Sequence, residues 1–340
     1  MLVQTNSSAN LSELDPHQFG SLIEPYRREL RAHCYRMLGS VKEAEEMVQE
    51  TFLRAWSRRE TYVGRATLRA WLYKIATNLC IDALRLKPRR ALPITREPAS
   101  TLEQPIPASI SEPIWLEPYP ADIPAPEETN PEARYSRVES IKLAFLASLH
   151  LLPPFQRAVL ILRDVLDWPA SEVADVLGQS IPSVKSALYR ARTTMARHQQ
   201  TLQPETVITQ ISDETMRSLL ERYMQAWEAA DVEGLVAILR DDCTFSMPPI
   251  PSWYRGRAEV GGLVSKTIFS GQARGRWRLL PTVANAQPGF GLYKLNQSSG
   301  NYDGYGIQVI TLAGNRISDI TTFRNPALIE IFGLPSLLTA

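Results

Sequence analysis

Residues 69–85, RAWLYKIATNLCIDALR, place an aromatic ring, two cations, an amide and an acid at steps of three or four. In chain order these residues are Trp71, Lys74, Asn78, Asp82 and Arg85. Apolar residues recur at helical spacing beside them, which predicts a helix with one buried stripe and one polar stripe. An ordinary solvated face would explain the polar stripe of a lone helix equally well. The rest of the chain must therefore decide what this stripe does.

Residues 182–197 form a second place where cations gather around an aromatic ring. One face of the predicted helix is apolar and should pack on the preceding helices: Val184, Ala187, Leu188, Ala191 and Met195. The other faces are polar: Ser183, Lys185, Ser186, Tyr189, Arg190 and Arg192. Cations suit phosphates and guanine edges, a hydroxyl can reach either, and a tyrosine ring can touch a thymine methyl.

The segment before this helix has helix-turn-helix spacing. A first helix is predicted from Phe155 to about Trp168, and Pro169 with Glu172 favours a new helix start. That short helix should stop at Gly178, where a tight GQS turn leads into the basic helix. An amphipathic helix with a solvated basic face is the plain alternative, but the turn length favours DNA reading.

Helices are also predicted throughout residues 15–90. FGSLIEPYRRELRAHCYRMLG has helical periodicity closed by Gly39, and VKEAEEMVQETFLRAW forms the next helix before the stretch quoted first. A chain of 340 residues suggests two or three domains.

Residues 91–135 separate the two basic blocks. They hold 10 of the 25 prolines and carry 2 cations against 8 acids, whereas 1–90 carries 15 against 10 and 136–204 carries 8 against 5. Proline cannot sustain a helix or a central strand, so we expect an extended and largely unpaired tether. Its one aromatic island, WLEPYPAD at Trp115 to Asp122, is either a docking element or a locally packed turn.

From Asp213 onward the pattern changes to helices followed by alternating segments, with a strand, a turn at Gly314-Asn315 and another strand near the end. The aromatic residues of this part could line a cavity for a small apolar ligand or form ordinary core: Tyr223, Trp227, Phe245, Trp253 and Trp277. None of the four histidines lies in 205–340, and no metal set or activated nucleophile is visible. We expect a non-catalytic domain without a metal or cofactor.

Compartment follows from the cysteines and the chain's hydropathy. The three scattered cysteines form neither a disulfide framework nor a metal site. The first residues lack the basic start and apolar core of a signal peptide, and no apolar run could span a membrane. A cytoplasmic protein with no membrane partner is expected.

Two motifs resemble the same family. LPPFQRAVLILRDVLDWPASEVADVLG followed by SVKSALYRAR resembles region 4 of the extracytoplasmic-function (ECF) group of bacterial RNA polymerase sigma factors, and KEAEEMVQETFLRAW followed by TLRAWLYKIATNLCIDALR resembles region 2. WLEPYPAD resembles a motif of the subgroup with a C-terminal SnoaL-like domain, and ADVEGLVAILRDDCTFSMPP with YRGR resembles that domain.

The resemblance implies two all-α domains and an α+β cone with a cavity. Region 2 would span 15–90, the linker 91–135, the region 4 helix-turn-helix 136–204, and the SnoaL-like regulatory domain with its tail 205–340. It implies a sigma factor that binds core RNA polymerase, at the clamp of the largest subunit and at the flap, and that recognises and opens promoter DNA. An anti-sigma factor is a further candidate partner.

The resemblance also assigns roles to residues. In region 2 the stripe Trp71, Lys74, Asn78, Asp82 and Arg85 would face the DNA where the duplex opens, and YVGRAT with Arg65 would supply the loop that holds a flipped base. Asp82 is expected to brace Arg85 or a neighbouring helix, because an acid repels phosphates. The clamp contacts would be Glu46, Gln49 and Glu50, although an exposed acidic face would explain the two acids as well.

Two other classes of function compete with the sigma factor. A SnoaL-like enzyme fused to DNA-binding helices is opposed by the absence of histidine from 205–340. A stand-alone helix-turn-helix regulator leaves residues 15–90 unexplained.

Overall fold

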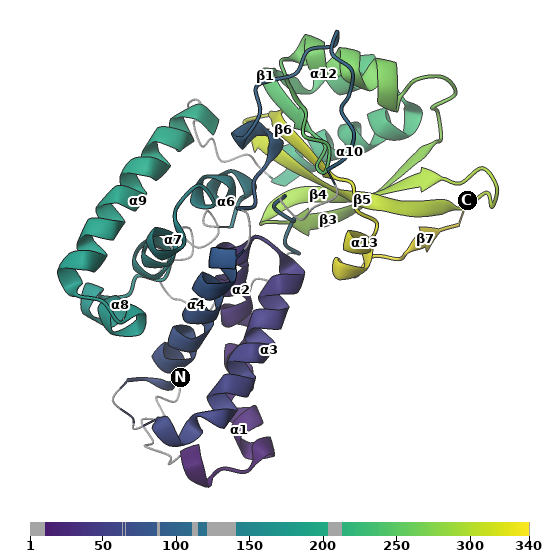
Figure 1. Cartoon of the computed structure of the whole chain (residues 1–340). Coiled ribbons are helices and arrows are strands. Elements are labelled where there is room, and N and C mark those ends of the chain that lie inside the picture. Colours follow the sequence, from purple (N-terminus) through teal and green to yellow (C-terminus); the bar gives the residue numbers. More distant parts are fainter. Residues whose placement is uncertain are drawn as a thin grey trace. The chain divides into compact units, whose positions relative to one another are not determined.

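The computed structural model describes residues 11–62, 64, 66–86, 89–110, 115–120, 141–202 and 213–339. These residues form two compact units (Figure 1). The first contains described residues of 11–90 and 148–198, and the second those of 91–120, 141–147 and 213–339.

The first half of unit 1 is a helical bundle. Its α-helices are α1 (Pro16–Ile23), α2 (Arg27–Leu38), α3 (Val41–Ser57) and α4 (Leu68–Leu86), with 3₁₀ turns at Leu11–Glu13, Glu24–Tyr26 and Arg59–Thr61. Asp15 and Gln18 form a capping box at the start of α1. Gly39 ends α2 in the left-handed conformation at φ 72°, and Ser40 caps α3. The single helix expected from Phe19 to Gly39 is wrong, because the 3₁₀ turn at Pro25 divides it.

The second half of unit 1 is the predicted helix-turn-helix. It consists of α7 (Pro154–Leu160) with a π-helical turn at Ile161–Val165, then α8 (Ala170–Leu177) and α9 (Ile181–Leu202). Gly178 ends α8 at φ 62°, and the Gln179 N–H donates to the Ala174 carbonyl across the turn (2.9 Å). The preceding helix α6 (Leu143–Leu149) begins within unit 2.

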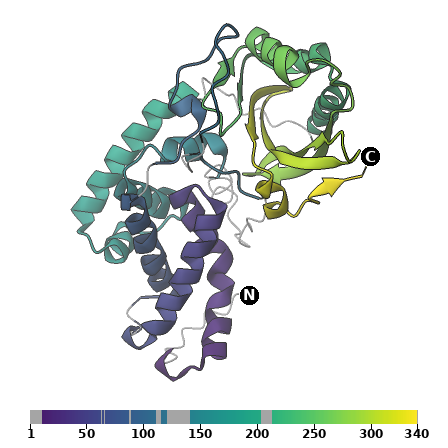
Figure 2. The same cartoon turned by 45° about the vertical axis from the view of Figure 1, so that its right-hand side comes forward.

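Unit 2 is a strongly curved sheet wrapped by helices (Figure 2). The helices are α10 (Asp213–Ala229), α11 (Val232–Ala237), α12 (Arg257–Leu263) with a π-helical turn at Val264–Ile268, and α13 (Ala327–Ile331). The strands are β1 (Leu239–Ser246), β2 (Trp253–Arg255), β3 (Trp277–Ala284), β4 (Gln287–Leu295), β5 (Tyr302–Ala313), β6 (Arg316–Phe323) and β7 (Leu337–Leu338). Their order is β2-β1-β6-β5-β4-β3, with β7 paired to β5 and β1 parallel to β6. The α+β cone is confirmed.

The linker is extended, as its prolines require, but the expectation that it is largely unpaired is wrong. The Trp253 indole N–H donates to the Glu97 carbonyl (2.7 Å), and the Ile110 N–H donates to the Pro249 carbonyl (3.0 Å). Leu116 and Tyr119 of the aromatic island are 0% and 1% exposed. Described linker residues therefore pack as part of unit 2, where their apolar side chains are buried.

Candidate nucleic-acid interface

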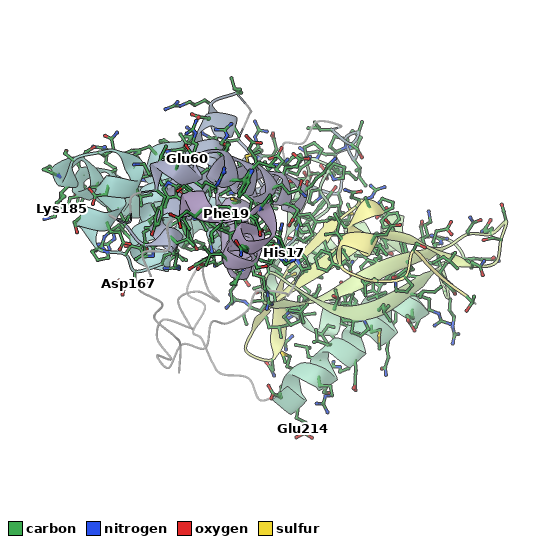
Figure 3. The ribbon with its side chains drawn as sticks, turned by 90° about the horizontal axis from the view of Figure 1, so that it is seen from below. His17, Phe19, Glu60, Asp167, Lys185 and Glu214 are labelled. Carbon is green, nitrogen blue, oxygen red and sulfur yellow. The ribbon has the colours of Figure 1, made fainter. Side chains whose placement is uncertain are left out.

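The two faces of α9 separate as the sequence predicts. All five residues of the expected packing face are buried: Val184, Ala187, Leu188, Ala191 and Met195. Lys185, Ser186, Tyr189, Arg190 and Arg192 are exposed, and Ser183 is half-buried. Figure 3 shows Lys185 on the outer side of the helix, and the Tyr189 ring is 74% exposed. An exposed tyrosine beside cations is available to contact a nucleic acid.

Two of the predicted DNA contacts in α9 already have partners. Arg192 makes a bidentate ion pair with Asp164, at 2.9 and 2.7 Å, and this hydrogen-bonded partner raises its pKa. Arg190 donates to the Ser186 hydroxyl (2.8 Å). Such exposed bonds are weak enough to be exchanged for a phosphate. Lys185 and Tyr189 point outward on the same face as Ser186.

The predicted stripe of α4 is on its surface. Lys74, Asn78, Asp82 and Arg85 are exposed, and Trp71 is half-buried with its ring 5.3 Å from that of Tyr62. Arg85 donates to the Asp82 carboxylate (3.0 Å), and Arg85 is one of the two partners expected for Asp82. Arg65 lies outside the described residues, as does Val63 of the same loop.

A network that the sequence did not reveal fixes the other side of α4. Arg69 makes a bidentate ion pair with Glu29 of α2 (2.9 and 2.8 Å), and the Tyr73 hydroxyl bonds the same carboxylate (3.3 Å). His33 of α2 lies 2.9 Å from the Thr77 hydroxyl. Burial, helped by Arg36 and Arg69, lowers the pKa of His33 to about 3. These residues hold α4 to α2 and so orient its polar stripe.

The helix-turn-helix packs on α4 within unit 1. Trp168, which precedes α8, is 4% exposed and lies 4.9 Å from the Tyr73 ring and 5.3 Å from the Arg69 guanidinium. The Lys74 ammonium donates to the Asp175 carbonyl of α8 (3.4 Å). One cation of the predicted DNA stripe is thus engaged by the other DNA-reading element.

A buried cation on the first helix of the helix-turn-helix bonds the end of α2. Arg157 of α7 is fully buried and donates to the carbonyls of Met37, His150 and Leu152. His150 bonds the Arg36 carbonyl in turn (3.2 Å). The last carbonyls of a helix lack intrahelical partners and carry partial negative charge, so they suit a cation. Burial lowers the pKa of Arg157 to about 9. Sequence reasoning missed this pair, since both residues look like ordinary positions in apolar segments.

The predicted polymerase contacts lie on α3. Glu46 and Gln49 are exposed, and half-buried Glu50 pairs with Arg54 (2.6 Å). Leu53, one helical turn beyond Gln49, is 64% exposed. An exposed leucine beside acids and an amide has the mixed composition of a protein-binding surface.

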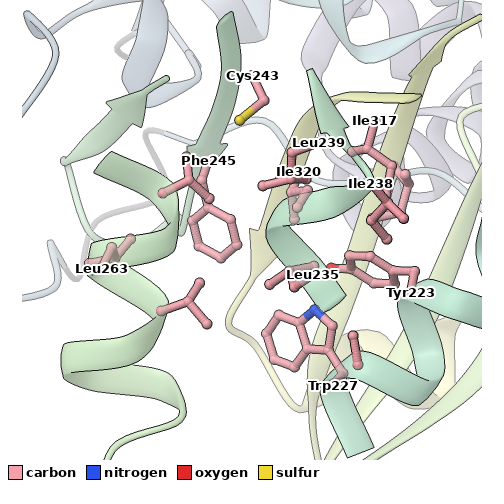
Figure 4. Close-up of a cluster of buried hydrophobic side chains, with 14 of the residues drawn as sticks. Tyr223, Trp227, Leu235, Ile238, Leu239, Cys243, Phe245, Leu263, Ile317 and Ile320 are labelled. Carbon is pink, nitrogen blue, oxygen red and sulfur yellow. The ribbon is translucent and has the colours of Figure 1, made fainter. Parts of the chain in front are cut away.

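The five aromatic residues proposed for a ligand cavity are all buried: Tyr223, Trp227, Phe245, Trp253 and Trp277. The Trp227 ring lies 5.9 Å from Trp277 and 6.0 Å from Tyr223. Figure 4 shows Tyr223, Trp227 and Phe245 among the apolar side chains of the core. Trp253 instead bonds the linker. These rings pack against protein groups, as the ordinary-core alternative predicts.

The described residues hold no further cluster of metal ligands or reactive groups. No group of three or more metal-ligating side chains occurs among them, and the three cysteines are free and buried. Asp241 and Asp242 lie on β1 and pair with Arg257 and Arg240, respectively. Within the ranges described, no helix is long and apolar enough to cross a membrane.

Three protein-family models match the chain. Sigma-70 region 2 matches residues 22–90, Sigma-70, region 4 matches 142–195, and the SnoaL-like domain matches 220–320. The matches follow the order of the two helical elements and the cone.

Individual relatives agree with these models. The chain is 38% identical over 329 residues to the ECF RNA polymerase sigma factor SigG of Mycobacterium tuberculosis, covering 94% of this chain and 85% of SigG. It is 31% identical over 226 residues to SigJ of the same organism, covering 66% of this chain and 64% of SigJ. The crystal structure of SigJ covers 93% of this chain and 99% of its own, with a TM-score of 0.56 and 24% identity, which shows a shared fold.

Proposed function

The chain belongs to the ECF RNA polymerase sigma factors, and on this premise we propose how its surfaces divide the work of promoter recognition. Its sigma regions 2 and 4 and its SnoaL-like domain make it a transcription initiation factor of that group. The roles given below to single residues are the proposal.

Helix α9 reads the upstream promoter element in the major groove. The observation that carries this assignment is the division of α9 into one fully buried face and one face on which Lys185, Ser186 and Tyr189 are exposed. Lysine and serine can hydrogen-bond base edges, and the ring can contact a thymine methyl. Ser183, Arg190 and Arg192 fix the helix on the backbone phosphates.

Helix α4 works where the duplex opens. Trp71 supplies a stacking surface for an unpaired base, a contact of about 1–3 kcal/mol per base. Lys74, Asn78 and Arg85 hold the strand, while Asp82 orients Arg85 through their ion pair. Arg65 belongs to the same site by its place in the loop before α4.

Helix α3 binds the clamp of the largest polymerase subunit through Glu46, Gln49 and Glu50, and region 4 binds the flap. Exposed acids and an amide on one helix suit a basic partner.

The packing of Trp168 and Asp175 on α4 defines an inactive state. Lys74 exchanges its exposed bond to the Asp175 carbonyl for a phosphate, and the two regions separate when the protein binds polymerase. The free energy of this packing sets how much of the protein is inactive before it meets polymerase.

The cone tunes activity in the cytoplasm and has no catalytic role. Its aromatic rings pack in the core, Asp241 and Asp242 pair with Arg257 and Arg240, and it lacks histidine. The cone acts in place of, or beside, an anti-sigma factor.

Transcription in vitro with purified core polymerase tests this function. Adding the protein should create a new start site on a promoter selected from genomic DNA, and Lys185→Ala with Tyr189→Ala should remove it. A start site that does not depend on the protein would contradict the assignment. The enzyme alternative predicts no new start site.

A further inference from the structure

Three segments of the chain meet at the turn between β3 and β4. Asn285, in this turn, is fully buried. Its backbone N–H donates to the Tyr119 carbonyl (2.8 Å), and its side-chain oxygen accepts the Tyr119 N–H (2.9 Å). Its side-chain nitrogen donates to the Ile141 carbonyl (2.8 Å). One residue of the cone thus holds the chain at two points separated by residues 120–140.

Gln287, two residues further on, extends the contact into region 4. Its side-chain oxygen accepts the Leu143 N–H (3.1 Å), and its nitrogen donates to the Thr311 hydroxyl on β5 (2.7 Å). Leu143 is the first residue of α6, and the first N–H groups of a helix have no partner within it. The cone therefore supplies the cap of a region 4 helix.

The segments held at this turn are buried. Ile141 is 0% exposed and Leu143 3%, and Pro120 forms an antiparallel bridge with Ala284. Asn285 and Ala286 both have φ of 55°, the backbone of a two-residue hairpin turn in which asparagine is favoured. In this conformation the Asn285 side chain bonds two separate segments of the chain, at Tyr119 and at Ile141.

We propose that Asn285 and Gln287 form a clip through which the cone holds the linker and the first helix of region 4. Linker residues before Tyr119 have further bonds to the cone: the Leu102 N–H donates to Glu259, and the Glu97 carbonyl accepts from Trp253. The helices of region 4 follow directly after Ile141, the second residue that Asn285 holds. Opening the clip would free the start of region 4 from the cone, so that only the covalent chain would connect it to Tyr119. The clip therefore limits how far region 4 can move from the linker, and it regulates the sigma activity on which this inference rests.

Hydrogen exchange on the full-length protein tests the clip. The variant Asn285→Gly with Gln287→Ala keeps a residue that tolerates positive φ and removes four side-chain bonds, three of which hold Tyr119, Ile141 and Leu143. Amides in peptides covering 115–120 and 141–149 should exchange at least tenfold faster, with no change in the β4–β5 hairpin. Transcription in vitro should change at least threefold in the same variant.

A matched control comes from the β4–β5 turn. The Asn296 side chain accepts the Ser298 N–H (3.0 Å) and donates to Asp303 (2.8 Å), so it supports only its own hairpin. Asn296→Gly should leave exchange at 115–120 and 141–149 unchanged. If the double variant fails to fold, Gln287→Ala alone, which leaves the turn backbone intact, should still speed exchange in 141–149.

Each result decides one claim. Wild-type exchange rates in both peptides of the double variant would overturn the clip. Faster exchange with unchanged transcription would overturn its regulatory role. If the wild-type protein directs no transcription, the sigma assignment fails, while the exchange data still judge the clip.

Discussion

The indole of Trp168 lies against the phenol of Tyr73, with ring centroids 4.9 Å apart and planes tilted by 58°. This contact joins the helix-turn-helix to α4, the helix proposed to open DNA. Arg69 lies on the same indole and is anchored by Glu29, so the contact also depends on α2. The two DNA-reading elements are held together by a compact aromatic and ionic cluster.

Replacing Trp168 by alanine should weaken this packing. Removing a buried tryptophan costs about 3–5 kcal/mol of unfolding free energy, and here the lost contacts include those to α4. Denaturant unfolding should report the loss, and small-angle scattering should show a larger radius of gyration. Trp168→Phe, which keeps a ring, should lose less. An unchanged radius in the alanine variant would show that Trp168 does not hold the two elements together.

Alanine at Lys185, Ser186 and Tyr189 should weaken recognition of the upstream promoter element. Each lost base contact should cost about 1–3 kcal/mol. A footprint with polymerase holoenzyme measures the effect, and co-purification with core polymerase should be unaffected. Lys266→Ala, an exposed cation of the cone, serves as control. The assignment fails if the triple variant gives a wild-type footprint.

Alanine at Glu46, Gln49 and Glu50 should have the reverse effect. These side chains are on the surface of α3 and support no buried contact, so the fold should survive while binding to polymerase is lost. Co-purification with core polymerase measures this, and Glu60→Ala, an exposed acid of the same unit, is the control. Undiminished co-purification would rule out α3 as the clamp contact.

Acid should destabilise the folded protein through two buried histidines. Burial lowers the pKa of His33 to about 3, and burial with Arg157 nearby lowers that of His150 well below its usual value. In the unfolded chain both titrate near 6.5, so below that pH the unfolded state takes up protons that the folded state excludes. The contribution of the histidines to the free energy of unfolding is present above about pH 6.5 and falls as pH decreases, by about 2 kcal/mol for His33 at pH 5 and in the same direction for His150.

Denaturant unfolding at pH 7 and pH 5 checks this dependence. His33→Gln with His150→Gln should flatten the difference between the two pH values, because glutamine does not titrate. An equal loss of stability in the variant would assign the acid effect to carboxylates instead.

The sequence predicted what depends on periodicity and capping. The buried face of α9 and the cap at Gly178 follow from residue spacing, and the Asp82–Arg85 pair follows from charge. The contacts between the linker and the cone could not be predicted, because proline content indicates an extended backbone but not which part of the chain packs against it. Arg157 was missed for a related reason. It bonds a backbone carbonyl of a distant helix, and because every residue has a carbonyl, residue types do not indicate such a partner.

Truncation should separate the role of the C-terminal tail from that of the whole cone. The tail packs on its own sheet: Leu328 and Ile329 are buried, and the Gly304 N–H donates to the Ser336 carbonyl (3.0 Å). A side chain at Gly291 would collide with Leu334, which shows how closely the tail covers that face. Removing 325–340 should therefore expose part of the sheet while leaving the linker bonded to the cone.

Removing 205–340 should have a larger effect. It takes away the cone groups that bond the linker, including Trp253 and Asn285, and leaves Leu116 and Tyr119 without their burial. A change of about 1.4 kcal/mol in such packing shifts a conformational equilibrium tenfold, so the two truncations should alter transcription by different amounts. Core binding should survive both, since α3 lies in the other unit. If both truncated proteins transcribe like the intact protein, the cone and its tail have no regulatory role.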